Sequence, residues 1–289
     1  MISDRLFLKP LASLCAIWMA LAPSGVAAQA RTPVDLELVM ATDVSWSIDD
    51  AEAQLQRQGG ADAFRNPEII RAIRSGFLRS IAVSYIDYSS SDFNRVVIDW
   101  RVIRGKADAE KFAADLLAAD LTSGRRTSIS DAVEQAAEMI ESNSIEGTRR
   151  VIDVSGDGPN NWGNLVDDVR DAVIRKRITI NGLPIMNPAD AFNSRYYLVD
   201  LDLYYRGCVI GGPGAFYIVA NSFKDYARAV RRKLVLEIAG AMPRHTEPPR
   251  ALFLRAANAT SARPSPTGYT YPKGCDIGER MRGFIMDEP

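Results

Sequence analysis

Short apolar runs alternate with amphipathic stretches between residue 35 and about residue 240. Runs of four to eight apolar residues are typical of buried strands, whereas apolar residues spaced three and four apart indicate a helix packed on one side. Strand-like runs separated by helical patterns favour a parallel sheet with helices on both faces. The runs that we interpret as strands of this sheet are 36–41, 81–86, 150–155, 178–185 and, as the last candidate, 214–220.

One further run, 95–100, follows 81–86 after the turn-like stretch SSSDFN, so it predicts an antiparallel edge strand. Helical spacing appears at Ala132, Val133, Ala136, Ala137 and Ile140, and again at Phe223, Tyr226, Ala227, Val230 and Leu234. Other helices are expected near 49–76, interrupted by Gly59 and Gly60 and by Pro67, near 106–119 and over 165–176. The predicted fold class is α/β: a doubly wound, mainly parallel sheet with one antiparallel edge strand.

The two ends of the chain differ from this middle part. Residues 1–30 have a basic start, the apolar stretch LASLCAIWMALA and the small residues AAQA, which is the layout of a signal peptide cleaved after Ala30. A retained N-terminal anchor is the alternative. Seven of the fifteen prolines lie between Pro243 and Pro289, so residues 241–289 are expected to form a loosely structured tail.

Composition and charge limit the classes of partner and the location that we expect. The formal net charge is −1 and no basic run stands beside interleaved aromatic residues, which argues against nucleic acid as a partner. The apolar runs after residue 30 are too short to span a bilayer. Signal cleavage would leave two cysteines, Cys208 and Cys275, and an even pair in an oxidising compartment predicts one disulfide. The expected location is therefore the periplasm or the medium.

Candidate chemistry lies where the first strand ends, at DVSWS, residues 43–47. Asp43, Ser45 and Ser47 stand at every second position there. The carboxyl ends of parallel strands meet at one edge of a sheet, so Thr127 in SGRRTSISDAV and Asp157 in VIDVSGDGPNN are expected to join them. Carboxylate and hydroxyl oxygens suit Mg²⁺. The same alternation predicts that Val44 and Trp46 point away from the ligands, toward packing.

Each of these residues also has a purely structural interpretation. Ser47 with Asp50, and Ser128 with Asp131, have the spacing of a helix capping box. Asp157 in GDGP is also typical of a turn. Asp153 lies inside a predicted strand, where we expect it to pair with an arginine rather than with a metal.

The three motifs together resemble the von Willebrand factor A domain family. DVSWS is similar to its D-x-S-x-S motif, TSISDAV to its threonine motif and SGDG to its strand-end aspartate, over residues 34–240. The resemblance implies a metal-ion-dependent adhesion site formed by Asp43, Ser45, Ser47, Thr127 and Asp157. It implies Mg²⁺, with Ca²⁺ or Mn²⁺ as substitutes, and a protein partner that offers a carboxylate to the metal. The stretches VIDVSGDGPNN and CVIGGPGAF resemble an uncharacterised branch of secreted bacterial proteins in that family, which implies no function.

Two other interpretations stay open. GDGPNN resembles the GDGxND motif of haloacid-dehalogenase-type phosphatases, which use a strand-end aspartate as nucleophile and a second aspartate two residues later as acid and base. Here Ser45 takes that second position and Asn161 replaces the final acid. The other interpretation is a von Willebrand A domain whose metal only stabilises the fold.

Overall fold

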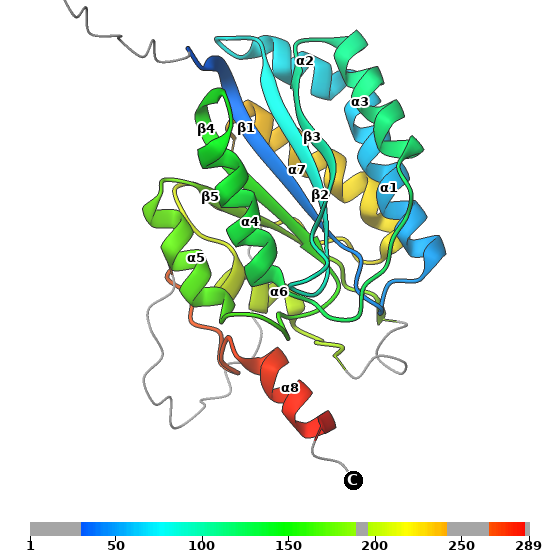
Figure 1. The fold of residues 1–289 in the computed structure, drawn as a ribbon, viewed down its shortest axis with the longest axis vertical. Coiled ribbons are helices and arrows are strands. Elements are labelled where there is room, and N and C mark those ends of the chain that lie inside the picture. Colours follow the sequence, from blue (N-terminus) through cyan, green and yellow to red (C-terminus); the bar gives the residue numbers. More distant parts are fainter. Residues whose placement is uncertain (1–29, 189–195, 242–265, 287–289) are drawn as a thin grey trace, which may run out of the picture. The chain divides into compact units, whose positions relative to one another are not determined.

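A five-stranded sheet forms the centre of the protein, in the order β3–β2–β1–β4–β5 (Figure 1). The computed structural model describes residues 30–188, 196–241 and 266–286. All neighbouring strands run parallel except β2 and β3, which are antiparallel. This arrangement confirms the predicted fold class. The strands are β1 Thr32–Asp43, β2 Ile81–Tyr88, β3 Arg95–Ile103, β4 Ile145–Gly156 and β5 Thr179–Pro184.

Helices cover both faces of the sheet and bury two separate apolar cores. The central strand β1 contributes to both, because alternate side chains point to opposite faces: Leu38 and Met40 enter one core, and Val39 and Ala41 enter the other. The first core lies under α1 Asp50–Arg65, α2 Pro67–Ser75, α3 Lys106–Ala118 and α7 Tyr226–Ala239. The second lies under α4 Ile129–Ser142, α5 Val166–Arg175, the short α6 Leu201–Tyr204 and the π-helical turn Tyr205–Val209 that follows it. A 3-10 turn, Phe223–Asp225, leads into α7.

The predicted interruption at Gly59 and Gly60 is wrong, because α1 runs through both glycines. A β-carbon at Gly59 would lie 2.9 Å from Cδ1 of Tyr226 and 3.0 Å from Cα of Ala227, so this glycine allows α7 to pack closely against α1. The helix ends instead at Arg65, and the next residue, Asn66, caps α2 by accepting a hydrogen bond from the Glu68 N–H at 2.8 Å. The break at Pro67 is confirmed.

The predicted strand at 214–220 is also wrong. This segment runs alongside β5 but pairs with it only through isolated bridges, Gly182 with Tyr217 and Ile185 with Ala220. The chain enters it through Gly212 and Gly214, which have φ angles of 95° and 73° and so form a turn rather than extended backbone.

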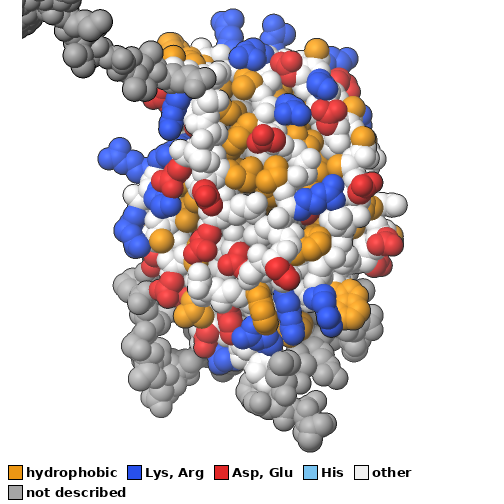
Figure 2. Space-filling view, in the orientation of Figure 1, with side chains coloured by type: hydrophobic (Ala, Val, Ile, Leu, Met, Phe, Trp, Pro, Cys, Tyr) orange, Lys and Arg blue, Asp and Glu red, His pale blue; other side chains and the backbone are white. Residues whose placement is uncertain are grey.

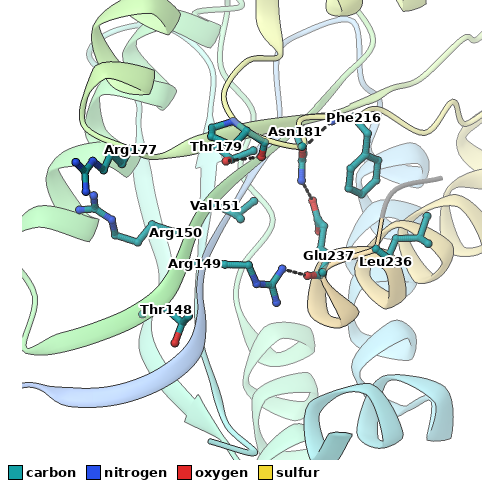
Figure 3. Close-up of a pocket in the computed structure, with 15 residues that line it drawn as sticks. Thr148, Arg149, Arg150, Val151, Arg177, Thr179, Asn181, Phe216, Leu236 and Glu237 are labelled. Carbon is teal, nitrogen blue, oxygen red and sulfur yellow. Dashed lines mark hydrogen bonds between the residues drawn. The ribbon is translucent and has the colours of Figure 1, made fainter. Parts of the chain in front are cut away.

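Asp153 on β4 pairs with a lysine, not with the expected arginine. Lys233 of α7 is fully buried and contacts the carboxylates of both Asp153 and Glu237, the latter at 2.5 Å. Asn181 of β5 donates a further hydrogen bond to Glu237 Oε1 at 2.8 Å (Figure 3). A lone buried charge would be costly, so these contacts fix α7 against β4 and β5.

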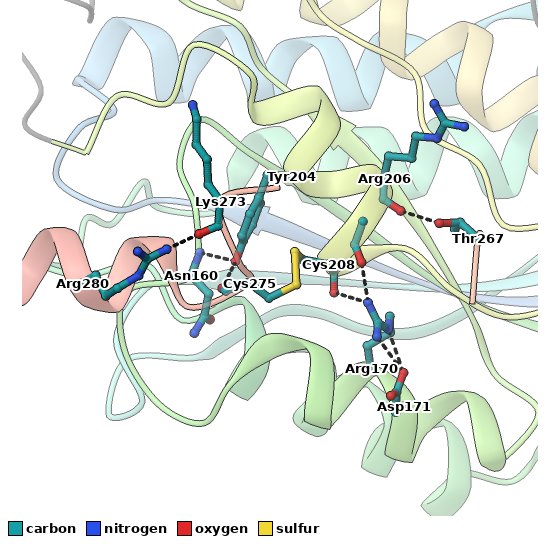
Figure 4. Close-up of a disulfide and its surroundings, with 11 residues drawn as sticks. Asn160, Arg170, Asp171, Tyr204, Arg206, Cys208, Thr267, Lys273, Cys275 and Arg280 are labelled. Atoms are coloured by element: carbon teal, nitrogen blue, oxygen red, sulfur yellow. Dashed lines mark hydrogen bonds and ion pairs between the residues drawn. A yellow bond between two sulfur atoms is a disulfide. The ribbon is translucent and has the colours of Figure 1, made fainter. Parts of the chain in front are cut away.

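A disulfide between Cys208 and Cys275 links the π-helical turn to the C-terminal segment, with the two Cα atoms 5.4 Å apart (Figure 4). Beyond it lies α8, Ile277–Met286, and Tyr271 before it is buried in the second core. The described part of the expected tail is therefore packed, contrary to the prediction of a loose structure. Residues 1–29, with the expected signal peptide, and residues 242–265 lie outside the described part of the chain. No helix in the described ranges is long and apolar enough to cross a membrane.

Candidate functional site

The candidate site lies where the strand order reverses. The chain passes from β1 to β2 on one side and from β4 to β5 on the other, so the loops after β1 and β4 diverge and leave space between them. Asp43 ends β1, and Asp157 follows Gly156 at the end of β4. A β-carbon at Gly156 would lie 2.8 Å from Asp43 Oδ2, so glycine is required for this close approach.

A chain of hydrogen bonds joins the residues of DVSWS to Asp157. Asp43 Oδ1 accepts a hydrogen bond from the Ser45 N–H at 2.8 Å, and the Ile48 N–H donates to Ser45 O at 2.9 Å, which closes a turn after the strand. The hydroxyls of Ser45 and Ser47 lie 3.3 Å apart. Ser47 Oγ donates to Asp157 Oδ1 at 3.0 Å. Four of the five predicted ligands therefore share one continuous cluster of oxygen atoms.

Ser47 is free for this contact because it does not cap α1. The capping residue is Asp49, which accepts a hydrogen bond from the Glu52 N–H at 2.8 Å, while Glu52 Oε2 accepts one from the Asp49 N–H at 3.2 Å. The predicted capping box of Ser47 with Asp50 is therefore wrong. The second predicted box forms only in part. Ser128 caps α4, since its hydroxyl accepts a hydrogen bond from the Asp131 N–H at 3.3 Å, but the Asp131 carboxylate accepts from the Ser128 hydroxyl at 2.6 Å and not from its backbone N–H.

The loop with Thr127, the fifth predicted ligand, is held beside the other two. The Gly124 N–H donates to Val44 O, in the loop after β1, at 2.9 Å, and the Asn161 N–H, in the loop after β4, donates to Thr127 O at 2.8 Å. Thr127 is buried, and a β-carbon at Gly158 would lie 4.0 Å from its Oγ1, next to Asp157. The structure thus brings all five predicted residues to one place.

Asn160 and Asn161 complete the site, and sequence reasoning gave neither a role. Asn161 pairs twice with Thr127: its Oδ1 accepts from the Thr127 N–H at 3.1 Å, and its N–H donates to Thr127 O at 2.8 Å. Asn160 Oδ1 accepts from the Ser130 N–H at 3.0 Å, and its Nδ2 donates to Glu279 of α8 at 2.7 Å. The sequence feature that could have predicted their role is the pair of asparagines directly after GDGP.

Burial and mutual repulsion disfavour negative charge at the centre of the cluster. Asp43 is fully buried, and its Oδ2 has no hydrogen-bond partner among the described residues. Burial, and after it the negative charge of Asp157, raises the pKa of the Asp43 carboxyl well above its ordinary value of 3.8. The sheet edge therefore holds two carboxylates that disfavour each other's ionisation.

Trp46 does not pack inward as predicted. Val44 is buried, but the Trp46 side chain is 74% exposed and the Arg125 guanidinium lies over its ring, 5.9 Å from the centroid. Alternation fails here because β1 has already ended at Asp43 and Ser45 turns the chain.

A separate hollow of about 460 Å³ lies at the other end of the sheet, by the first residues of β4 and β5 (Figure 3). Arg149, Arg150, Arg177 and Glu237 are among its lining residues. Two of these groups already have partners, because Arg149 donates to backbone carbonyls of α7 and Glu237 contacts Lys233. None of the five predicted ligands lines this hollow.

The sheet order, the two helical layers and the loop cluster define a von Willebrand factor A-type fold. The chain belongs to the family described as "Protein of unknown function (DUF1194)", whose model matches residues 33–242. No curated protein sequence matches the chain.

Solved structures share the fold at low sequence identity. Proximal thread matrix protein 1 from the mussel byssus is 13% identical over 73% of this chain and 47% of its own, with a TM-score of 0.50. The pilus adhesin SpaC from Lactobacillus rhamnosus GG is 12% identical over 72% of this chain and 30% of its own, also with a TM-score of 0.50. This chain thus corresponds to less than half of either protein, and at these identities the likeness shows the fold alone.

Proposed function

We propose that this protein is a non-enzymatic binding domain that engages a protein partner through a divalent cation held at the end of β1. Asp43, Ser45, Ser47, Thr127 and Asp157 would hold the ion as a metal-ion-dependent adhesion site. Mg²⁺ is the ion that we expect, with Ca²⁺ or Mn²⁺ as substitutes, because the donors are hard oxygens.

One observation carries this proposal: Asp43 Oδ2 is buried, has no hydrogen-bond partner among the described residues, and lies near a second carboxylate, that of Asp157. An unpaired buried carboxylate oxygen such as Asp43 Oδ2 is costly in a folded protein, and a cation bound between Asp43 and Asp157 would remove that cost. The surrounding hydroxyls fit the same group, since Ser45, Ser47 and Thr127 are neutral oxygen donors. The residues present therefore suit a hard divalent cation.

The mixture of charged and neutral ligands would determine what the site can bind. Two aspartates balance the charge of a divalent cation only if both are ionised, and three hydroxyl donors add no negative charge. A bound cation would supply a positive centre with a coordination position for an external carboxylate. Ser47 is exposed whereas Asp43 is buried, so the site opens to solvent on the side of Ser47.

The periplasm or the medium is the location that fits this function. The Cys208–Cys275 disulfide supports an oxidising compartment, as does the signal-like start of the sequence. SpaC, one of the proteins of similar fold, is a pilus adhesin, and a binding role for this chain agrees with that description by analogy of fold only.

Calorimetric titration with Mg²⁺ tests the metal site. Wild type should bind one ion per chain, and Asp43→Ala and Asp157→Ala should abolish binding. Asp50→Ala is the matched control, because Asp50 is an exposed carboxylate in the first turn of α1. Wild type that binds no divalent ion at millimolar concentration, or Asp157→Ala that binds as well as wild type, would overturn the proposal.

The phosphatase alternative needs an acid where Ser45 stands and a metal ligand where Asn161 stands. In the structure Asn161 Oδ1 is already bonded to the Thr127 N–H. We expect no magnesium-dependent hydrolysis of p-nitrophenyl phosphate. Turnover that disappears in Asp43→Asn would favour the phosphatase instead.

A further inference from the structure

Two tryptophans and three arginines form two cation–π groups on the loops of the candidate metal site. Arg125 lies over Trp46, while Arg126 and Arg282 lie over Trp162 at 5.4 Å and 4.8 Å from the ring centroid. Arg125 and Arg126 are consecutive in the chain, so one short segment contributes to both groups. We name these five residues the tryptophan–arginine rim. Figure 2 shows hydrophobic and basic side chains alternating along the lower end of the molecule.

The rim borders each of the three loops that form the site. Trp46 stands between Ser45 and Ser47, Arg126 directly precedes Thr127, and Trp162 directly follows Asn161. Arg282 comes from α8, which is held in place by the disulfide at Cys275 and by the contact of Glu279 with Asn160. A partner group bound at the metal would therefore have the rim next to it.

The arginines of the rim keep hydrogen-bonding capacity for a partner. None of the three forms an ion pair with another described residue, in contrast to Arg57, which pairs with Asp87 at 2.8 Å. Arg126 donates one hydrogen bond, to Tyr196 Oη at 3.2 Å. A guanidinium stacked on a ring keeps its edge N–H groups free to bind a carboxylate with two hydrogen bonds.

We propose that the tryptophan–arginine rim binds an acidic polypeptide segment whose carboxylates flank the one that reaches the metal. This inference rests on the proposed function and names the chemistry of its partner. Exposed tryptophan and arginine are the residue types most enriched in the energetic centres of protein interfaces. Trp46 and Trp162 are 74% and 38% exposed, so both rings are accessible to a partner.

Charge favours a short acidic segment over a polyanion such as a nucleic acid or a sulfated glycan. The whole chain has a formal net charge of −1, so it lacks the general positive field that attracts long polyanions. The positive charge of the rim comes from three arginines, so a few carboxylates suffice to match it.

The test measures binding of a fluorescently labelled deca-glutamate peptide by anisotropy, with Mg²⁺ or with EDTA, and uses a deca-glutamine peptide as the reference. Wild type should bind deca-glutamate more tightly than deca-glutamine. Its affinity for deca-glutamate should fall as the salt concentration rises. Arg125→Gln and Arg282→Gln should each weaken binding about 1.5-fold to fivefold, which is the usual effect of removing an exposed charge pair. Arg177→Gln, an exposed arginine by the distant hollow, is the matched control and should bind as wild type does.

Metal binding of the same variants separates this inference from the proposed function. Mg²⁺ affinity should be unchanged in Arg125→Gln and Arg282→Gln, because neither side chain is one of the proposed ligands. If these variants bind Mg²⁺ and the peptide as wild type does, the rim inference is wrong while the metal site stands. Tighter binding of heparin or single-stranded DNA than of deca-glutamate would also overturn it. Absence of Mg²⁺ binding in wild type would instead overturn the proposed function.

Discussion

Ser47 and Asp157 are 110 residues apart in the sequence, and the Ser47 hydroxyl donates a hydrogen bond to Asp157 Oδ1 at 3.0 Å. The bond ties the loop after β1 to the loop after β4, which are the two loops that diverge at the reversal of strand order. It also removes Ser47 from the role of helix cap, which Asp49 takes. The site and the start of α1 can therefore be altered separately.

Ser47→Ala should weaken Mg²⁺ binding and leave the free energy of unfolding within about 0.5 kcal/mol of wild type, as is usual for a surface substitution. Asp49→Ala should do the reverse: it should cost about 1 kcal/mol through the lost cap and leave Mg²⁺ affinity unchanged. Calorimetric titration and urea unfolding measure the two effects. If Ser47→Ala destabilises as much as Asp49→Ala, the bond from Ser47 to Asp157 stabilises the fold and the two roles are not separate.

Substitutions of Thr127 and of Asn161 should differ in their effects on stability. Thr127→Ala removes one proposed ligand but no helix cap, so Mg²⁺ affinity should fall while stability changes by less than about 1 kcal/mol, and Thr127→Ser should restore affinity. Asn161→Ala leaves the Thr127 N–H without its side-chain acceptor, which should cost about 1–3 kcal/mol of stability and also weaken metal binding. Thermal melts beside metal titration test both. Equal stability of Asn161→Ala and wild type would argue against this pairing.

Removal of the disulfide should destabilise the protein and release α8. Cys208 and Cys275 are 67 residues apart, for which the chain-entropy model gives at most about 4 kcal/mol of stabilisation. In Cys208→Ser/Cys275→Ser, the amides of α8 should exchange hydrogen faster while those of β1 keep the protection set by global unfolding. Mass spectrometry of unreduced peptides from secreted protein should show the linked pair, and free thiols there would contradict it.

Stability should fall as pH rises toward neutrality because of Glu237. Burial, with the charge of Asp153 added, raises the pKa of Glu237 from 4.5 to about 7. Below the unfolded value both states are protonated. Between pH 4.5 and about pH 7 the carboxyl ionises in the unfolded state but stays protonated in the folded state. The free energy of unfolding therefore falls over this range, by at most about 3 kcal/mol. In Glu237→Gln, which keeps the acceptor for Asn181, unfolding curves measured at several pH values should show a smaller decline, because the raised pKa of Asp43 still contributes. A parallel decline in both proteins would assign it to other groups.

The strands and most helices were predictable because their side-chain periods are local. In β1, apolar residues occupy both faces, as expected for a strand between two helical layers. The positions of Asp43, Thr127 and Asp157 followed from a general property of parallel sheets, namely that the loops after their strands meet. Neither inference required knowledge of distant contacts.

The errors arose where a distant contact or the end of an element decides the outcome. Gly59 suggests a helix break until α7 is known to lie against it. The two-residue alternation placed Trp46 inward, but that rule applies only within a strand, and β1 ends at Asp43. The partner of Asp153 comes from α7, and its identity as Lys233 has no local signal. The ten-residue helix α8 was missed because the prolines around it favoured the prediction of a loosely structured tail.

The position of α8 bears on where a working unit of this protein ends. The family match stops at residue 242, whereas Arg282 and Cys275 lie beyond it. A chain shortened to the matched residues would keep all five proposed metal ligands, but it would expose one side of Trp162 and leave the buried Cys208 as an unpaired thiol. Such a fragment would report on metal affinity and underestimate affinity for a partner, so recombinant protein for binding studies should extend through residue 286.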